Sequence, residues 1–332
     1  MAERLNITGR NLGRKIGAPL LGLGILLSNP EQGANAFVDY SLPVLDQTWP
    51  DSEGGEVFAH MHFDKNVWGY YATEDNGLPQ PYMIALNNAL SNPVASAEIR
   101  KGQVKDLTVR KATSETGDNG QFDYRQSEVK LFISGKNLPS EDRLYFDTRV
   151  LKAVVIHEGF HADSEKWYQY MRGSLDQPRP SEDLAADIEQ LQAAQRAVDD
   201  IYYSALPKPC SPNLGEAQSS CTQERLQKYA DESFHCIDEG HALQDLLDRE
   251  QPLHIGHPFN GTYEAAASVI TSLEMNPSYM PDCLDKTPSN LTAAIRTLTN
   301  QILKLTFKTS PAIEEALRRT PDRNNAINRL IS

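Results

Sequence analysis

Residues 151–161 read LKAVVIHEGFH, and this stretch contains the histidine and glutamate spacing that decides both the expected fold and the expected chemistry. Positions four apart lie on one face of a helix, so the imidazoles of His157 and His161 can bind a single ion, with Glu158 beside its open coordination position. Zinc lowers the pKa of bound water towards about 7, and a neighbouring carboxylate can accept the proton. The motif therefore predicts a Zn²⁺ site in which Glu158 activates zinc-bound water.

The segments around this motif predict an α+β chain. The apolar run 153–156 indicates a buried helix within the proline-free stretch 144–171. Apolar and β-branched residues predict two strands, 103–110 and 128–134, and we expect 128–134 to be the edge strand of a small N-terminal sheet. The region 37–80 has little periodicity and is expected to be irregular. Further helices are predicted over 81–90, 182–204, 223–248, 292–307 and 311–319, so that the C-terminal half is mainly helical.

The first 36 residues are typical of an export signal. Four basic residues precede the apolar run 16–27, and Ala34-Asn35-Ala36 matches a cleavage pattern. We expect residues 1–36 to be a signal peptide or an N-terminal anchor, and residues 37–332 to form one domain. Contact with a membrane is expected only if this segment stays uncleaved, so the protein is predicted to be periplasmic or secreted.

Composition and cysteine usage agree with export. The chain of 332 residues has 45 acidic and 32 basic side chains, a net charge of −13, which argues against a nucleic-acid partner. Its four cysteines are an even number, and the lengths of the intervening loops favour disulfides between Cys210 and Cys221 and between Cys236 and Cys283, although four cysteines permit three pairings.

His157, Glu158 and His161, on a helix that follows a strand, resemble the zincin metallopeptidases over roughly residues 125–250. The resemblance implies a zincin-like fold, hydrolysis of peptide bonds in a peptide or protein substrate, and a third metal ligand elsewhere in the chain. Metzincins are excluded, because Ser164 and Trp167 stand where their pattern requires glycine and histidine. The chain is therefore more similar to the gluzincins, whose third ligand is a glutamate from a later helix.

Glu239 is the preferred third ligand. Residues 239–242 have the pattern E-G-x-A, which resembles the third-ligand segment of several bacterial gluzincin-like families. The small residues Gly240 and Ala242 would let this helix approach the HExxH helix closely. Glu264 is the next candidate, followed by Asp238 and His241.

Two further residues are candidates for a supporting catalytic role. His235 and Tyr263 could stabilise the oxyanion of a tetrahedral intermediate, and His235 could instead hold the Glu239 carboxylate. The competing hypotheses are an exported metal-binding protein without catalytic activity and an interaction protein whose HExxH pattern is accidental.

Overall fold

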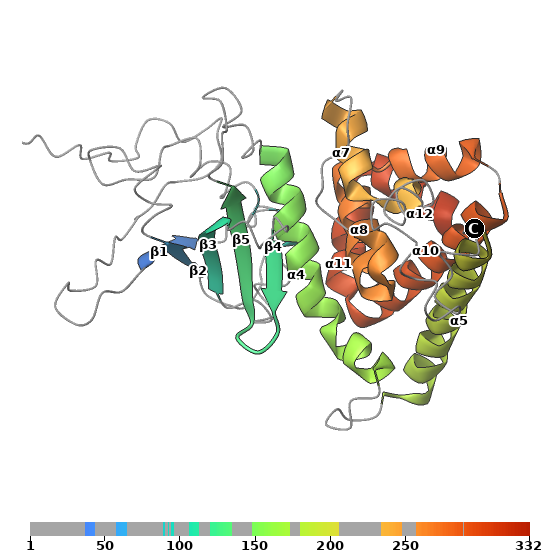
Figure 1. The fold of residues 1–332 in the computed structure, drawn as a ribbon, viewed down its shortest axis with the longest axis horizontal. Helices are drawn as coiled ribbons and strands as arrows, with labels where there is room; N and C mark the ends of the chain where they lie inside the picture. The colour runs from blue at the N-terminus through green and yellow to red at the C-terminus, as the bar shows by residue number, and fades with distance from the viewer. Residues whose placement is uncertain are drawn as a thin grey trace, which may run out of the picture.

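The computed structural model describes residues 37–43, 58–64, 89, 92, 94–95, 106–112, 120–134, 148–172, 180–205, 234–247, 257–287 and 289–332. Within them the chain is α+β, as predicted, with a small sheet followed by a mainly helical body (Figure 1). The leader 1–36, most of the expected helix 81–90 and the Cys210–Cys221 pair lie outside the described residues.

The sheet has five strands in the order β1-β2-β3-β5-β4. β3 pairs in parallel with β2 and with β5, whereas β1 and β4 pair antiparallel with β2 and β5. The strands are β1 (Phe37–Pro43), β2 (Phe58–Asp64), β3 (Asp106–Ala112), β4 (Gly120–Asp123) and β5 (Glu128–Ser134).

Two expectations about this sheet are wrong. The segment 128–134 is a strand, but it lies between β3 and β4, so β4 is the edge strand near the helices. The region 37–80 is not irregular throughout, because it contains β1 and β2. Their sequences carry a signal that the prediction missed: 38–42 (VDYSL) and 59–64 (AHMHFD) alternate apolar and polar residues, the pattern of a strand exposed on one face. A four-residue strand such as β4 is too short to leave a periodic signal in the sequence.

The helical body contains the elements α4 (Thr148–Met171), α5 (Glu182–Ala205), η4 (His235–Ile237), α7 (Glu239–Leu247), η5 (Pro258–Asn260), α8 (Thr262–Met275), α9 (Tyr279–Lys286), α10 (Asn290–Thr309), α11 (Pro311–Arg318) and α12 (Pro321–Ile331). The expected helices near 144–171, 182–204, 292–307 and 311–319 are confirmed. The described part of 223–248 is not one helix, because Asp238 is extended and separates η4 from α7.

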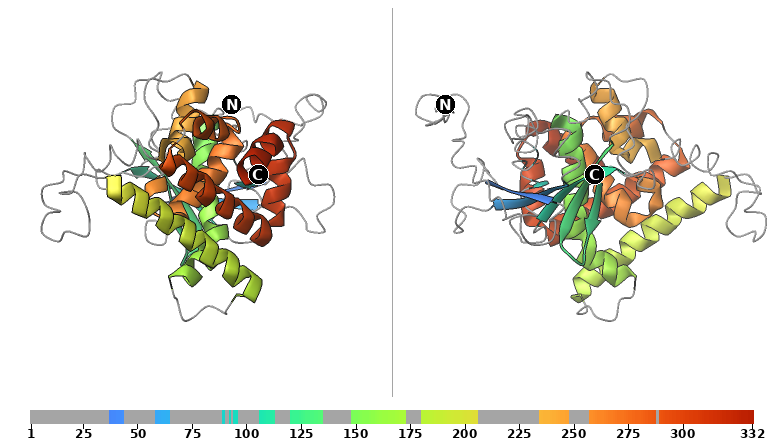
Figure 2. Two further views of the ribbon diagram at one scale, coloured as in Figure 1. Left: turned by 90° about the vertical axis from the view of Figure 1, so that its right-hand side faces the viewer. Right: turned by 60° about the vertical axis from the view of Figure 1, so that its left-hand side comes forward.

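Helix α4 lies between the sheet and the C-terminal helices, and it packs against β4 and β5 on one side and α8 on the other (Figures 1 and 2). This position explains its apolar start, since Ala153, Val154, Val155 and Ile156 are all buried. A helix enclosed on both sides must be apolar around most of its circumference.

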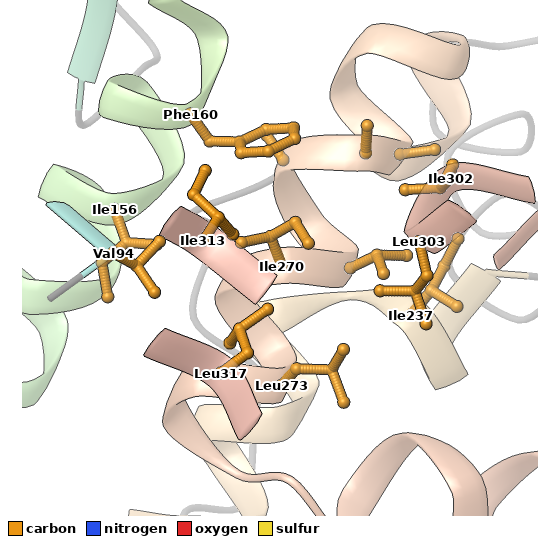
Figure 3. Close-up of a cluster of buried hydrophobic side chains, with 14 of the residues drawn as sticks. Val94, Ile156, Phe160, Ile237, Ile270, Leu273, Ile302, Leu303, Ile313 and Leu317 are labelled. Atoms are coloured by element: carbon orange, nitrogen blue, oxygen red, sulfur yellow. The ribbon is translucent and has the colours of Figure 1, made fainter. Parts of the chain in front are cut away.

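The main core forms where α4 meets the C-terminal helices. Ile156 and Phe160, one turn apart on α4, point towards Ile270 of α8 and Ile313 of α11 (Figure 3). Residues further along the core come from η4, α8 and α10. Helix α10 is the longest of the C-terminal helices, and α5 packs along it.

A disulfide joins Cys236 in η4 to Cys283 in α9, and this confirms one of the two expected pairings. Among the described helices, none is both long and apolar enough to cross a membrane.

A buried carboxylate fastens α8 to its neighbours. Glu274, at the C-terminal end of α8, has a side chain that is 1% exposed. It contacts Lys152 of α4 at 3.1 Å and Arg323 of α12 at 2.6 Å, and it accepts a hydrogen bond from Asn92 at 2.7 Å. A carboxylate without solvent must keep such partners, because an unpaired buried charge is strongly unfavourable.

Replacing Glu274 by Gln should therefore lower the free energy of unfolding by about 3 kcal/mol, since the two cations lose their buried counter-charge. Urea denaturation measures this loss. Asp285→Asn is the matched control, because Asp285 pairs with Arg296 and Arg329 at the surface and exposed pairs contribute about 1 kcal/mol or less. Equal losses in the two variants would contradict the structural role of Glu274.

Candidate metal centre

The two histidines of the motif lie one turn apart on α4, as the spacing predicts. Their rings meet edge to face, with centroids 4.8 Å apart. The side chains of His157 and His161 are only 3% and 5% exposed. Glu158 is also buried on α4. The helix thus brings two imidazoles and a carboxylate into a site that is largely closed to solvent.

Glu264 completes this group from α8. Its Oε2 lies 3.1 Å from Nε2 of His157 and 3.5 Å from Nε2 of His161. Two ligand atoms around a tetrahedral zinc ion at 2.0–2.1 Å are about 3.3 Å apart, so these spacings fit a metal site. The three side chains form a group that could hold a metal ion.

The local sequence explains why Glu264 reaches the histidines. Gly261 has a φ of 119°, a conformation that favours glycine, and this turn starts α8 at the next residue. Glu264 then falls in the first helical turn, where the helix dipole favours a negative charge. With a side chain that is 27% exposed, Glu264 is also the most solvent-accessible member of the group.

Glu239 lies on the other side of His157. Its Oε1 is 2.5 Å from Nδ1 of His157, the ring nitrogen opposite the one that faces Glu264. This placement differs from the sequence prediction, in which Glu239 was the third ligand. A carboxylate on Nδ1 fixes the tautomer and the orientation of a metal-binding imidazole. The geometry therefore favours Glu264, the alternative candidate, as the ligand and Glu239 as the partner that orients His157.

Helix α7 begins where it does because Asp238 caps it. The Asp238 carboxylate accepts a hydrogen bond from the backbone N–H of Gly240 at 2.7 Å. Glu239 is consequently the first residue of α7, and its side chain is completely buried. Asp238 itself pairs with His241 at 3.5 Å. Of the two other candidates for a third ligand, Asp238 thus caps α7 and His241 pairs with Asp238.

The electrostatics of the site favour positive charge between the carboxylates. Burial alone would lower the pKa of His157, but the nearby charge of Glu239, together with Glu264 and Glu158, raises it well above its ordinary value. Burial would raise the pKa of Glu264, but its hydrogen bonds to the two histidines lower it strongly. Burial and the charge of His157 lower the pKa of His161, despite its hydrogen bond to Glu264. A cation held at the Nε2 atoms would pair with Glu264, the carboxylate that faces both of them.

Tyr263 supports His161. Its ring stacks on the imidazole with centroids 4.0 Å apart, and Tyr168 covers its other side at 4.3 Å. Its hydroxyl lies 3.0 Å from both the backbone carbonyl of His161 and the carboxylate of Glu165. Burial and the charge of Glu165 raise the pKa of Tyr263, so the phenol stays neutral. These contacts favour a role in holding His161 over the expected role as an oxyanion donor.

His235 lies beside the disulfide. Its Nε2 is 3.5 Å from Sγ of Cys236, and its ring meets that of His241 edge to face at 5.9 Å. His235, Cys236 and Cys283 also form a group with metal-binding side chains, but metal binding requires thiolates and these two sulfurs are bonded to each other. The structure thus associates His235 with the disulfide and not with the His157–His161–Glu264 group.

The chain matches no protein-family model, no curated protein and no solved structure. The interpretation of the site therefore rests on its own residues.

The two glutamates should respond differently to substitution. Glu239→Gln should weaken zinc binding by about 10- to 100-fold, because it removes the charge that orients His157. Glu264→Ala should weaken binding more, because it removes a ligand atom. Titration against a competing chelator measures both affinities, and Glu189→Gln, at an exposed position of α5, is the control. Loss of zinc from the Glu239 variant alone would instead assign Glu239 as the ligand.

Proposed function

We propose that this chain is a zinc-dependent metallopeptidase of the gluzincin-like type, with His157, His161 and Glu264 as the protein ligands. The observation that supports this most directly is the convergence of two imidazole Nε2 atoms and one carboxylate oxygen beside Glu158. When bound, zinc supplies a Lewis acid that activates water and polarises a carbonyl group.

Glu158 performs the proton transfers in this proposal. Its carboxylate accepts a proton from the attacking water and then donates it to the nitrogen of the departing amine, so it acts first as base and then as acid. Burial suits this role, because a site with little water strengthens the interaction between a carboxylate and nearby charges. Glu239 and Tyr263 keep the two imidazoles in place during these steps.

A peptide is the substrate that fits the surroundings. Among the described strands β4 is the edge nearest α4, and an extended peptide can add to such an edge through backbone hydrogen bonds. A chain bound there would pass beside Glu158, because β4 begins against this side chain. In this proposal β4, and not the expected edge strand 128–134, provides the edge for the substrate.

We further propose that the protein works outside the cytosol. The Cys236–Cys283 disulfide supports this, since such bonds persist in oxidising compartments. The N-terminal pattern of basic residues, apolar run and cleavage site provides the export signal in this proposal.

Glu158→Gln separates catalysis from metal binding. The amide cannot accept the proton, so peptide hydrolysis should fall by about 100- to 10,000-fold, while one zinc ion per chain is retained. Mass spectrometry of a digested peptide library measures the activity, and elemental analysis measures the zinc.

The same pair of measurements distinguishes the competing hypotheses. A zinc-loaded wild-type protein without hydrolytic activity would indicate a metal-binding protein that is not an enzyme. A protein that takes up no zinc would contradict the proposal entirely.

A further inference from the structure

The first residue of β4 is packed directly against the catalytic base. A Cβ atom added to Gly120 would lie 2.7 Å from Cγ and 2.8 Å from Oε1 of Glu158, and 2.8 Å from Cγ1 of Val154. Val154 and Glu158 are one turn apart on α4, so they form the stripe of the helix that faces the sheet. The absence of a side chain at position 120 is what lets β4 approach this stripe.

The backbone does not explain this glycine. Gly261 is the described glycine with a positive φ, so Gly120 has a conformation open to other residues. Position 120 therefore needs glycine for the space beside Glu158 and not for its dihedral angles.

A larger residue at position 120 would displace Glu158 more readily than Val154. Valine branches at Cβ, which leaves its γ carbons close to the backbone with one preferred rotamer in a helix. Glutamate has more rotatable bonds, and its carboxylate can move without any change in α4. The predicted consequence is a folded protein with a misplaced base.

We propose that Gly120 is a positioning residue. Because it has no side chain, the side chain of Glu158 can occupy the space next to β4, and this sets the location of the Glu158 carboxylate. This inference rests on the proposed function, in which Glu158 is the base. Gly120 is therefore a requirement that lies outside the HExxH motif. It belongs to the sheet, at the start of β4, and comes before the motif in the sequence.

The test compares Gly120→Ala with Gly159→Ala. Gly159 is the residue after Glu158, but a Cβ there meets nothing within 4 Å, so it adds the same methyl group without contact. In the alanine variant at 120, kcat for a quenched fluorescent peptide drawn from the library should fall by about 10- to 100-fold, the effect of an error near 1 Å in a reacting group. KM and zinc content should stay close to those of the control. The melting temperature should stay close to that of the wild type, because alanine at the mid-helix position 159 stabilises α4 by itself.

A second substitution distinguishes displacement of Glu158 from a general packing defect. Val154→Ala in the Gly120→Ala background removes the contact with Cγ1 and leaves the contact with Glu158. It should relieve any instability but should not restore kcat. Recovery of kcat in this double variant would overturn the proposal, as would a Gly120→Ala enzyme with the same kcat as Gly159→Ala.

A structural measurement keeps the inference testable without hydrolysis. Crystal structures of zinc-loaded Gly120→Ala and Gly159→Ala show where the Glu158 carboxylate lies in each. It should be displaced by about 1 Å in Gly120→Ala, with α4 and the metal ligands unmoved, while Gly159→Ala matches the wild type. An unmoved carboxylate in Gly120→Ala would contradict the inference. A displaced carboxylate in a protein whose wild type has no peptidase activity would retain the inference and reject the proposed function.

Discussion

The site depends on the imidazole of His157 being held between two carboxylates. Glu239 contacts Nδ1 from a completely buried position, and Glu264 contacts Nε2 from the side nearer to solvent. Burying a carboxylate without a partner is costly, so each glutamate constrains the ring. The ring in turn fixes the start of α7 and the start of α8 relative to α4. The geometry of the candidate metal centre is therefore also a condition for packing three helices.

Helix α8 is held against α4 at both of its ends. Its first turn carries Tyr263 and Glu264, which contact the two histidines, and its last turn carries Glu274, which pairs with Lys152. Both ends of α8 are thus fastened to α4 by polar contacts, while Ile270 lies in the core between them. The Cys236–Cys283 disulfide restrains the segment that leads into Glu239. The sheet, the disulfide and the helices thus all constrain the side chains of the candidate metal centre.

Local spacing was sufficient to predict the motif helix and its buried apolar run, because both depend on residues within a few turns. It also predicted several C-terminal helices and one disulfide. The break at Asp238 did have a local signal, since aspartate is a preferred N-cap residue and its carboxylate accepts a hydrogen bond from the backbone at the start of α7. The position of β4 could not be predicted, because it depends on which segments pack together. The same holds for the choice between Glu239 and Glu264, since both are glutamates at the start of a helix and only the tertiary arrangement shows which nitrogen of His157 each one faces. Gly120 left no signal of its role, since a glycine at the first position of a short strand is indistinguishable in the sequence from a turn residue.

In the proposed centre Glu264, and not Glu239, joins the two histidines at the metal. An anomalous difference map collected at the zinc absorption edge from crystals of the zinc-loaded protein tests it most directly. We expect one peak within about 2.0–2.2 Å of Nε2 of His157, Nε2 of His161 and a carboxylate oxygen of Glu264, with Glu239 still against Nδ1 of His157. A peak bound by Glu239, or no peak between the two histidines, would contradict it.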